Sequence, residues 1–312
     1  MSEQQDLLKT MMKKYRDILE EKQQQKNNKK IKQKKQDDIN HHYIPQCYLG
    51  NFSDENSNIH VLNKEYGNIK GFKSSQIMYG KVLYDVYYMN EHFQGLEKYF
   101  KFFEDRMPYI LNSVKNMAME KNGVNRDDKK KLAFFAAIQY CRNPHAEIPS
   151  MIEICKNLVN YHKNLKKFPF KLLLPDIRKK HLKMISDAIK LSVKMYGEEE
   201  TMPLVWMARI YFFPYILFNY ENSNNITVIF NANEKVSPLI TNDNPVMVKS
   251  FDLFRGFRWF YYPLFNNLAI IQGIEGRTVE GLNKMAYENG VKRVISGDRS
   301  YISKIKNRYF KK

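Results

Sequence analysis

Cysteine is scarce in this sequence. Cys47, Cys141 and Cys155 are its three cysteines; they lie far apart, and none belongs to a CxxC pair. A disulfide framework and a four-cysteine zinc site both need more cysteines, at closer spacing. The sequence therefore excludes both. Unpaired thiols fit the reducing environment of the cytoplasm, where we expect the protein to be located.

A long apolar run is also missing. The most apolar window, LVWMARIYFFPYILF, covers about 15 residues and contains Arg209 and Pro214, whereas a helix needs about 20 apolar residues to cross a bilayer. The first residues, MSEQQDLLKT, lack the basic and apolar regions of a secretory signal. We therefore expect no membrane association and interpret the apolar window as a buried helix.

Standard catalytic motifs are absent as well. The sequence contains no P-loop, GxGxxG, HExxH, GxSxG or EF-hand pattern, and no repeat of solenoid length. Its HxxP element is loosely similar to the histidine region of HNH nucleases, but the later Asn, His and zinc-knuckle cysteines are missing. Motifs therefore assign no mechanism and no cofactor to this chain.

Positive charge, by contrast, is in excess. The chain has 51 Lys and Arg against 33 Asp and Glu, a net charge of +18. Such a surplus attracts polyanions, so nucleic acid, either RNA or DNA, is the first partner to expect. The alternative is that an AT-rich genome sets the Lys, Asn and Ile usage and that the charge serves solubility. Residues 1–40 hold 11 basic and 7 acidic residues, so the body of the chain keeps about +14.

The chain divides into a tail and a body. Residues 1–40 start with helix formers and continue as a Lys, Gln and Asn run of low complexity, which predicts a basic helical tail or tether. Leu7, Leu8, Met11 and Met12 would give this helix an apolar stripe for a protein partner. Residues 41–312 are expected to form a single domain with a real core, since 43% of the chain is hydrophobic.

The pattern of the body predicts an α+β fold, with a central helical block flanked by small N-terminal and C-terminal β-elements. Short β-like pieces cover 59–88, and helical spacing begins near 95, with a break at Pro108. The Asn143–Pro144 step should end a helix. Further helices are expected at 147–164, 175–196, 202–219, 279–289 and the C-terminus, with strands over 226–273 and at 293–296.

Three stretches contain candidate functional residues. In HHYIPQCYLGNF, residues 41–52, the apolar residues are spaced to be buried, while His42 and Gln46 are polar groups four residues apart. Buried polar groups need partners. His42 is therefore either a core histidine with its hydrogen bonds satisfied, in a turn fixed by Pro45, or a general base or metal ligand that faces a cleft.

The second stretch is the helix that ends at QYCRNP. Gln139 and Arg142 continue the face set by Leu132 and Phe135, so both side chains should point inward. An inward arginine requires an anion, either a carboxylate such as that of Glu97 or Glu104, or a phosphate held by the guanidinium fork. The prediction is therefore a structural ion pair or a phosphate site.

The third stretch is PLITNDNPVMV. Two apolar strand pieces are interrupted by Asn242, Asp243 and Asn244, and Pro245 keeps Asn244 extended. This is either a simple Asx turn or a turn at the end of buried strands, where proteins often place functional groups. Asp243 is a candidate acid or metal ligand in the second case.

Together these three stretches resemble the uncharacterised bacterial family labelled domain of unknown function 4238. That family's pattern opens with His-Tyr-Val-Pro-x-x-Tyr-Leu-x-x-Phe and later shows Thr-Ser-Asp-Asn-Pro, and the resemblance covers residues 41 to about 305. Asn242 departs from the usual Ser or Thr, and Cys47 from an aromatic. The resemblance implies no established reaction. The polar positions that it implies are His42, Glu97, Glu104, Gln139, Arg142, Asp243 and Asn244.

These features support the hypothesis of a nuclease, and the type of family that the sequence resembles implies a role in phage defence or as a toxin. His42 would be a base or metal ligand, the acidic residues would be acids or ligands for Mg²⁺ or Mn²⁺, and Arg142 would bind a phosphate. We predict that His42, Arg142 and Asp243 share one pocket, with side chains within about 12 Å of one another. The alternatives are a non-catalytic nucleic-acid-binding protein and a regulatory protein that docks a partner through its N-terminal helix.

Overall fold

The computed structural model describes residues 40–81, 83–88, 91–93, 95–120, 123–161, 179–217, 225–252, 256–274, 276 and 278–310. The tail expected over residues 1–40 lies outside the described residues except for Asn40, so its helix and its partner stay predictions.

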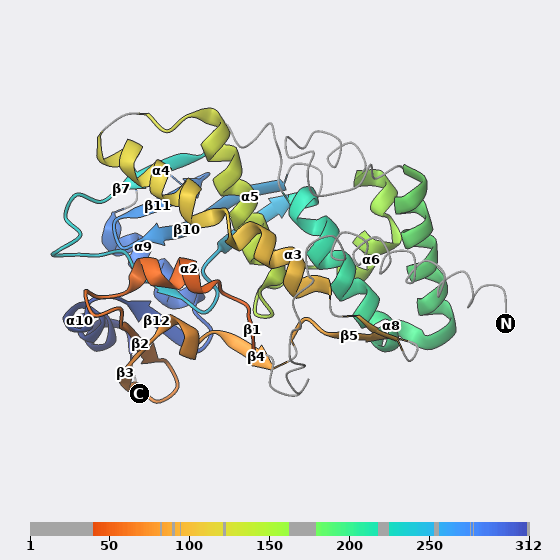
Figure 1. The fold of residues 1–312 in the computed structure, drawn as a ribbon, viewed down its shortest axis with the longest axis horizontal. Helices are drawn as coiled ribbons and strands as arrows, with labels where there is room; N and C mark the ends of the chain where they lie inside the picture. The colour runs from red at the N-terminus through yellow and green to blue at the C-terminus, as the bar shows by residue number, and fades with distance from the viewer. Residues whose placement is uncertain are drawn as a thin grey trace, which may run out of the picture.

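The described chain runs from short strands through a helical block to longer strands (Figure 1). Its first part comprises β1 Asn40–His42, α2 Gln46–Leu49, η2 Gly50–Phe52, β2 Ile59–Asn63, β3 Ile69–Phe72, η3 Ser74–Gln76, β4 Tyr79–Lys81, β5 Val86–Tyr88 and β6 Glu91–Phe93. The helical block comprises α3 Gly95–Glu104, α4 Met107–Met119, α5 Arg126–Arg142, α6 Met151–Lys156, η4 Leu158–Tyr161 and α8 Lys179–Leu217. The last part comprises β7 Thr227–Phe230, β8 Thr241–Asn242, β9 Met247–Asp252, β10 Gly256–Phe265, β11 Leu268–Gln272, α9 Val279–Asn289, β12 Arg293–Ser296 and α10 Arg299–Tyr309. The mixed α+β character is as predicted.

Local chemistry explains where the helices of the block begin and end. Pro108 lies in the first turn of α4, where its missing N–H leaves no bond unmade, and this separates α4 from α3. The α5 helix ends at Arg142 because Asn143, which precedes a proline, is extended (φ −78°, ψ 122°). In α8, Gly197 has a φ of 88° that interrupts helical geometry, so the two helices expected at 175–196 and 202–219 meet there.

One predicted helix is shorter than expected. The sequence pattern favours a helix over 147–164, but α6 ends at Lys156, and a 3-10 turn, η4, follows. Asn157 leaves the helical region with a φ of −129°, as expected for a residue that readily ends helices. The helix starts late as well, because Ser150 before it is in the left-handed region, with a φ of 56°.

Two four-stranded antiparallel sheets complete the fold. One has the order β7-β11-β10-β9 and is built entirely from the C-terminal third. The other has the order β3-β2-β12-β8, so that a pair of N-terminal strands meets a pair of C-terminal strands at β2 and β12: Val61 pairs with Ile295, and Ile295 pairs with Thr241. Strands from the predicted N-terminal β-elements, β2 and β3, therefore share one sheet with β8 and β12 from the C-terminal part.

The main core centres on α5. Every residue from Leu132 to Arg142 is buried, because α4 and α8 pack against this helix. Leu132 is fully buried and Phe135 is 7% exposed, as predicted. A second cluster, which includes Leu62, Leu282 and Ile302, lies between the β3-β2-β12-β8 sheet and helices α9 and α10. None of the helices in the described ranges is long and apolar enough to cross a membrane.

Arg209 of α8 fixes the end of α5. Its Nε donates to the carbonyl of Cys141 (2.7 Å), and its Nη2 donates to the carbonyls of Asn143 and Ala146 (2.8 Å each). The last carbonyls of a helix have no partner within the helix and carry partial negative charge, which a cation complements. Arg209 thereby holds the turn that positions Arg142.

Candidate functional site

The segment of residues 41–52 crosses the core rather than lying on the surface. Strand β1 pairs with β4, with His42 opposite Tyr79, and Pro45 leads into α2. Tyr48 and Phe52 are fully buried, and the Tyr48 hydroxyl contacts the Thr241 hydroxyl (2.8 Å) and donates to the Pro263 carbonyl (2.7 Å). Through Tyr48 this motif therefore contacts both four-stranded sheets, one at β8 and the other at β10.

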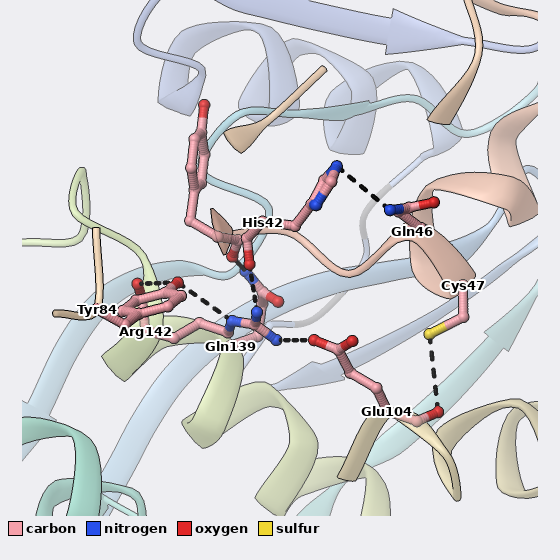
Figure 2. A network of polar contacts seen from close by, with 8 residues as sticks. His42, Gln46, Cys47, Tyr84, Glu104, Gln139 and Arg142 are labelled. Carbon is pink, nitrogen blue, oxygen red and sulfur yellow. Dashed lines mark hydrogen bonds and ion pairs between the residues drawn. The ribbon is translucent and has the colours of Figure 1, made fainter. Parts of the chain in front are cut away.

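Arg142 lies at the centre of a polar cluster under this segment. It is 1% exposed, and its guanidinium donates to the Glu104 carboxylate (2.5 Å), to the main-chain carbonyl of His42 and to the Tyr84 hydroxyl (3.4 Å) (Figure 2). The Phe100 ring packs 4.2 Å from the guanidinium carbon. Burial opposes the charged form of Arg142, but Tyr84 and Glu104 outweigh it and raise its pKa. The anion that the inward arginine requires is thus Glu104.

The His42 ring faces away from this arginine. Figure 2 shows the His42 carbonyl directed at the guanidinium while the ring lies beside Gln46, with Nε2 3.5 Å from the Gln46 Nε2. The ring also meets the edge of Tyr79, at 5.6 Å between centroids. Half-burial lowers the pKa of His42 below its usual 6.5. A neutral, half-exposed imidazole retains a nitrogen that can accept a proton.

Gln139 and Glu97 are two further polar residues near Arg142, and each has one side-chain oxygen that accepts no hydrogen bond from the part of the chain that the structure describes. Gln139, 3% exposed, donates from Nε2 to the Tyr43 carbonyl (2.8 Å). Within the described ranges, the buried Gln139 Oε1 and the buried Glu97 Oε2 have no hydrogen-bond partner. Burial raises the pKa of Glu97 to about 7, although the nearby charge of Arg142 works in the opposite direction. Glu97 is therefore a carboxyl group that exchanges its proton near neutral pH.

Asp243 follows strand β8 directly and binds the turn that leads into strand β12. Its carboxylate accepts hydrogen bonds from the main-chain N–H groups of Val291 (2.7 Å), Lys292 (2.8 Å) and Arg293 (3.1 Å). Asn143, the residue after Arg142, donates to the Asp243 carbonyl (2.9 Å). The structure thus joins the Arg142 and Asp243 segments through Asn143, while the Asp243 carboxylate itself holds the turn at 291–293.

Hydrogen bonds also hold the rest of the TNDNP stretch, residues 241–245, in place. The Asn244 N–H donates to the Asn242 Oδ1 (2.7 Å), which is the Asx turn considered from the sequence. Asn289 donates to the Asn244 carbonyl, and the Asn244 Oδ1 lies 3.4 Å from the Asn143 Nδ2. Through these hydrogen bonds the stretch connects the end of α5, the end of α9 and the β3-β2-β12-β8 sheet.

A comparison with protein families finds one family model that covers this region. The family model described as "Protein of unknown function (DUF4238)" matches residues 40–300, which contain every candidate residue. The chain belongs to the DUF4238 family. No curated protein and no solved structure gives a significant match.

Sequence reasoning missed three residues of the site in this DUF4238 chain. His41, 2% exposed, accepts the Tyr84 main-chain N–H at Nδ1 (2.9 Å), and its Nε2 lies 3.8 Å from the Asp85 carboxylate. Its ring stacks on Tyr84, whose hydroxyl also donates to the Arg142 carbonyl (3.1 Å). The doubled histidine was the available signal, because one His of the pair could serve the core and the other the site.

The expected metal ligands Glu104 and Asp243 of the DUF4238 chain have other partners in the structure. Among the residues that the structure describes, no three His, Cys, Asp or Glu side chains come together in a way that could hold a metal ion. Glu104 binds Arg142, and Asp243 binds main-chain N–H groups. The chemistry that these residues offer is proton transfer by His42, whose ring is half-exposed, and by Glu97, which lies near the Arg142–Glu104 ion pair.

Proposed function

We propose that this protein is a nuclease that cleaves RNA by acid–base catalysis, with His42 as the base and Glu97 as the acid. The observation that carries the proposal is that the Arg142 guanidinium binds the main-chain carbonyl of His42 and is close enough to Glu97 to influence its pKa, which places both residues in the same part of the fold. Burial lowers the pKa of the His42 imidazole and raises the pKa of the Glu97 carboxyl group to about 7. Groups of this kind are suited to catalysis because each exchanges a proton close to the working pH.

The proposed reaction uses the nucleophile that RNA itself supplies. His42 accepts the proton of a ribose 2′-hydroxyl as that oxygen forms a bond to the adjacent phosphorus. The bond from phosphorus to the 5′-oxygen breaks, and the protonated carboxyl of Glu97 gives its proton to that oxygen. The products are a 2′,3′-cyclic phosphate and a free 5′-hydroxyl, and the positive charge of Arg142 favours the extra negative charge of the transition state.

The other members of the cluster position the main chain that carries His42. Arg142 fixes the His42 main chain and the Glu104 carboxylate at once, through two arms of one planar fork. Gln139 fixes the neighbouring Tyr43 carbonyl. The basic surplus of the body, about +14, supports a polyanionic substrate.

The test is cleavage of end-labelled RNA and DNA between pH 4.5 and 9, in EDTA and in Mg²⁺ or Mn²⁺. We expect RNA cleavage that resists EDTA, with a 2′,3′-cyclic phosphate end. The rate should fall as the pH drops through the lowered pKa of His42 and as it rises above the value of about 7 for Glu97. Cleavage of DNA that requires a metal would contradict this mechanism, and no cleavage of either substrate would end the proposal.

Matched histidine variants sharpen the test. His42→Ala should reduce the rate at least about 100-fold with little loss of stability, since the His42 carbonyl and not its ring binds Arg142. His60→Ala is the control, because His60 is also partly exposed and pairs with Asp54 away from the cluster. Equal activity of the two variants would exclude His42 as the base.

A second function is favoured by a different observation. Arg142, Gln139 and Asp243 form hydrogen bonds within the protein, which engages them in the fold, and the basic surplus then supports binding of nucleic acid without cleavage. Tight, salt-dependent binding of RNA or DNA without any cleavage would select this alternative.

A further inference from the structure

The positive charge of the body is concentrated in two short segments. Residues 64–73 and 292–310 together contain nine basic and two acidic residues, a net charge of about +7, which is half of the surplus outside the tail. We call these two segments the basic corner. Its basic residues are Lys64, Lys70, Lys73, Lys292, Arg293, Arg299, Lys304, Lys306 and Arg308.

The two segments are adjacent in space although they are more than 200 residues apart in sequence. The Lys64 N–H donates to the Lys292 carbonyl (2.8 Å), and strand β2 pairs with β12. The Phe310 ring lies so close to Gly67 that a Cβ there would come within 2.4 Å of the ring. Figure 1 shows β2, β3, β12 and α10 together at one end of the fold.

Acidic neighbours neutralise only a part of this charge. The Asp298 carboxylate caps α10 by accepting the N–H groups of Ser300 (2.7 Å) and Tyr301 (3.0 Å). Helix α9 adds Glu280, which pairs with Arg308 (2.6 Å), and Glu288, which lies 3.7 Å from Lys284. By contrast, Lys70, Lys292, Arg299 and Lys304 are all exposed.

An exposed aromatic ring stands at the edge of the basic corner. Tyr66, in the turn between β2 and β3, is 66% exposed, and the turn is held by the Asn63 side chain, which accepts the Tyr66 N–H (3.1 Å). Proteins that bind single strands combine basic side chains along the backbone with aromatic rings on which bases stack. A base inside a duplex is stacked on its neighbours and has no free face for such a ring, so the tyrosine favours a single strand.

We infer that the basic corner binds single-stranded nucleic acid, with phosphates on its lysine and arginine side chains and a base stacked on Tyr66. The inference rests on the proposed function for its substrate class, and it assigns the binding of that substrate to a surface separate from the acid–base residues.

The test measures binding separately from cleavage. Fluorescence anisotropy of a 2′-O-methyl RNA, which has no free 2′-hydroxyl to attack its phosphates, gives the affinity of the intact wild-type chain in EDTA. The variant Lys70→Glu/Lys304→Glu should bind this RNA roughly tenfold more weakly. The slope of the logarithm of its binding constant against the logarithm of salt concentration should be smaller in magnitude by about 1.4, as expected for two lost contacts to a single strand. The control variant is Lys183→Glu/Lys194→Glu, which makes the same change of charge at two exposed lysines of α8. Its affinity for the RNA should fall by less than about twofold.

Tyr66 variants test the stacking. Tyr66→Ala should weaken single-strand binding about 5- to 100-fold and leave duplex binding unchanged, while Tyr66→Phe, which keeps the ring, should bind as the wild type does. Equal losses in the basic-corner and α8 variants would mean that net charge alone acts, and would overturn the inference. So would a preference for duplexes, or binding to anionic lipid vesicles in place of RNA.

The outcomes for the two proposals are distinct. Wild-type binding that is insensitive to the basic-corner variants refutes the basic corner and leaves the nuclease proposal standing. RNA binding that depends on the basic corner, without cleavage, refutes the nuclease and keeps the basic corner. No binding of any nucleic acid refutes both.

Discussion

Replacing Glu97 by glutamine should make the protein more stable at pH 8 and leave its stability at pH 4 almost unchanged. Burial raises the pKa of Glu97 from 4.5 to about 7, so between these values the folded protein holds a proton that the unfolded chain releases. The free energy of unfolding therefore falls as the pH rises from about 4.5 to about 7, and the full penalty applies above that. Glutamine keeps the shape and has no charge to bury.

The magnitude follows from the two pKa values. Their difference of about 2.5 corresponds to at most about 3 kcal/mol. Water reaches part of the Glu97 side chain and screens it, which reduces the expected gain to about 1 to 2 kcal/mol. The same variant should lose RNA cleavage, because a glutamine cannot give up a proton to the leaving oxygen.

Urea unfolding of the wild type and Glu97→Gln at pH 4, 6, 7 and 8 measures this effect. The difference between the two midpoints should grow with pH while the slope of the transition stays the same. Glu104→Gln is the control on the same helix: it removes the partner of the buried Arg142 and should destabilise the protein. A loss of stability in Glu97→Gln at pH 8 would show that Glu97 is ionised and stabilised by Arg142, which would refute the reasoning.

Three other substitutions test the packing of the site by urea or thermal unfolding. Arg142→Lys should cost about 2 to 4 kcal/mol, because an ammonium cannot reach Glu104, Tyr84 and the His42 carbonyl together; a wild-type midpoint would refute this. Asp243→Ala should cost about 2 to 4 kcal/mol, because three main-chain N–H groups lose their acceptor; an inactive variant of normal stability would instead assign Asp243 to catalysis. Leu132→Ala should cost about 2 to 5 kcal/mol as a cavity in the core, and near-native melting would contradict its assigned place.

The sequence predicts those parts of the fold that local chemistry determines. The helix at 279–289 and the strand at 293–296 occur as predicted, since a hydrophobic period and flanking glycines define both. Gln139 and Arg142 point inward because they share a helical face with Leu132. Local patterns carry this information completely.

Contacts between distant segments are not predictable in this manner. The pairing of Val61 with Ile295 depends on the packing of two cores and leaves no mark on either strand's own pattern. The Tyr84 hydroxyl on Arg142 and the His41 ring on Tyr84 are contacts of the same kind. A single sequence could therefore identify the polar residues but not the order in which they bind one another.

Strand β1 has a mechanical consequence for the protein. It starts at Asn40, and its two remaining residues are His41 and His42, so the 39 preceding residues are joined to the site through one asparagine. A load on that tail, from a bound partner or a fusion tag, would act on the three residue pairs that connect β1 with β4. It would displace His41 and His42, and the His42 carbonyl would pass the displacement on to Arg142. A displacement of this three-residue strand would therefore move a hydrogen-bond acceptor of Arg142.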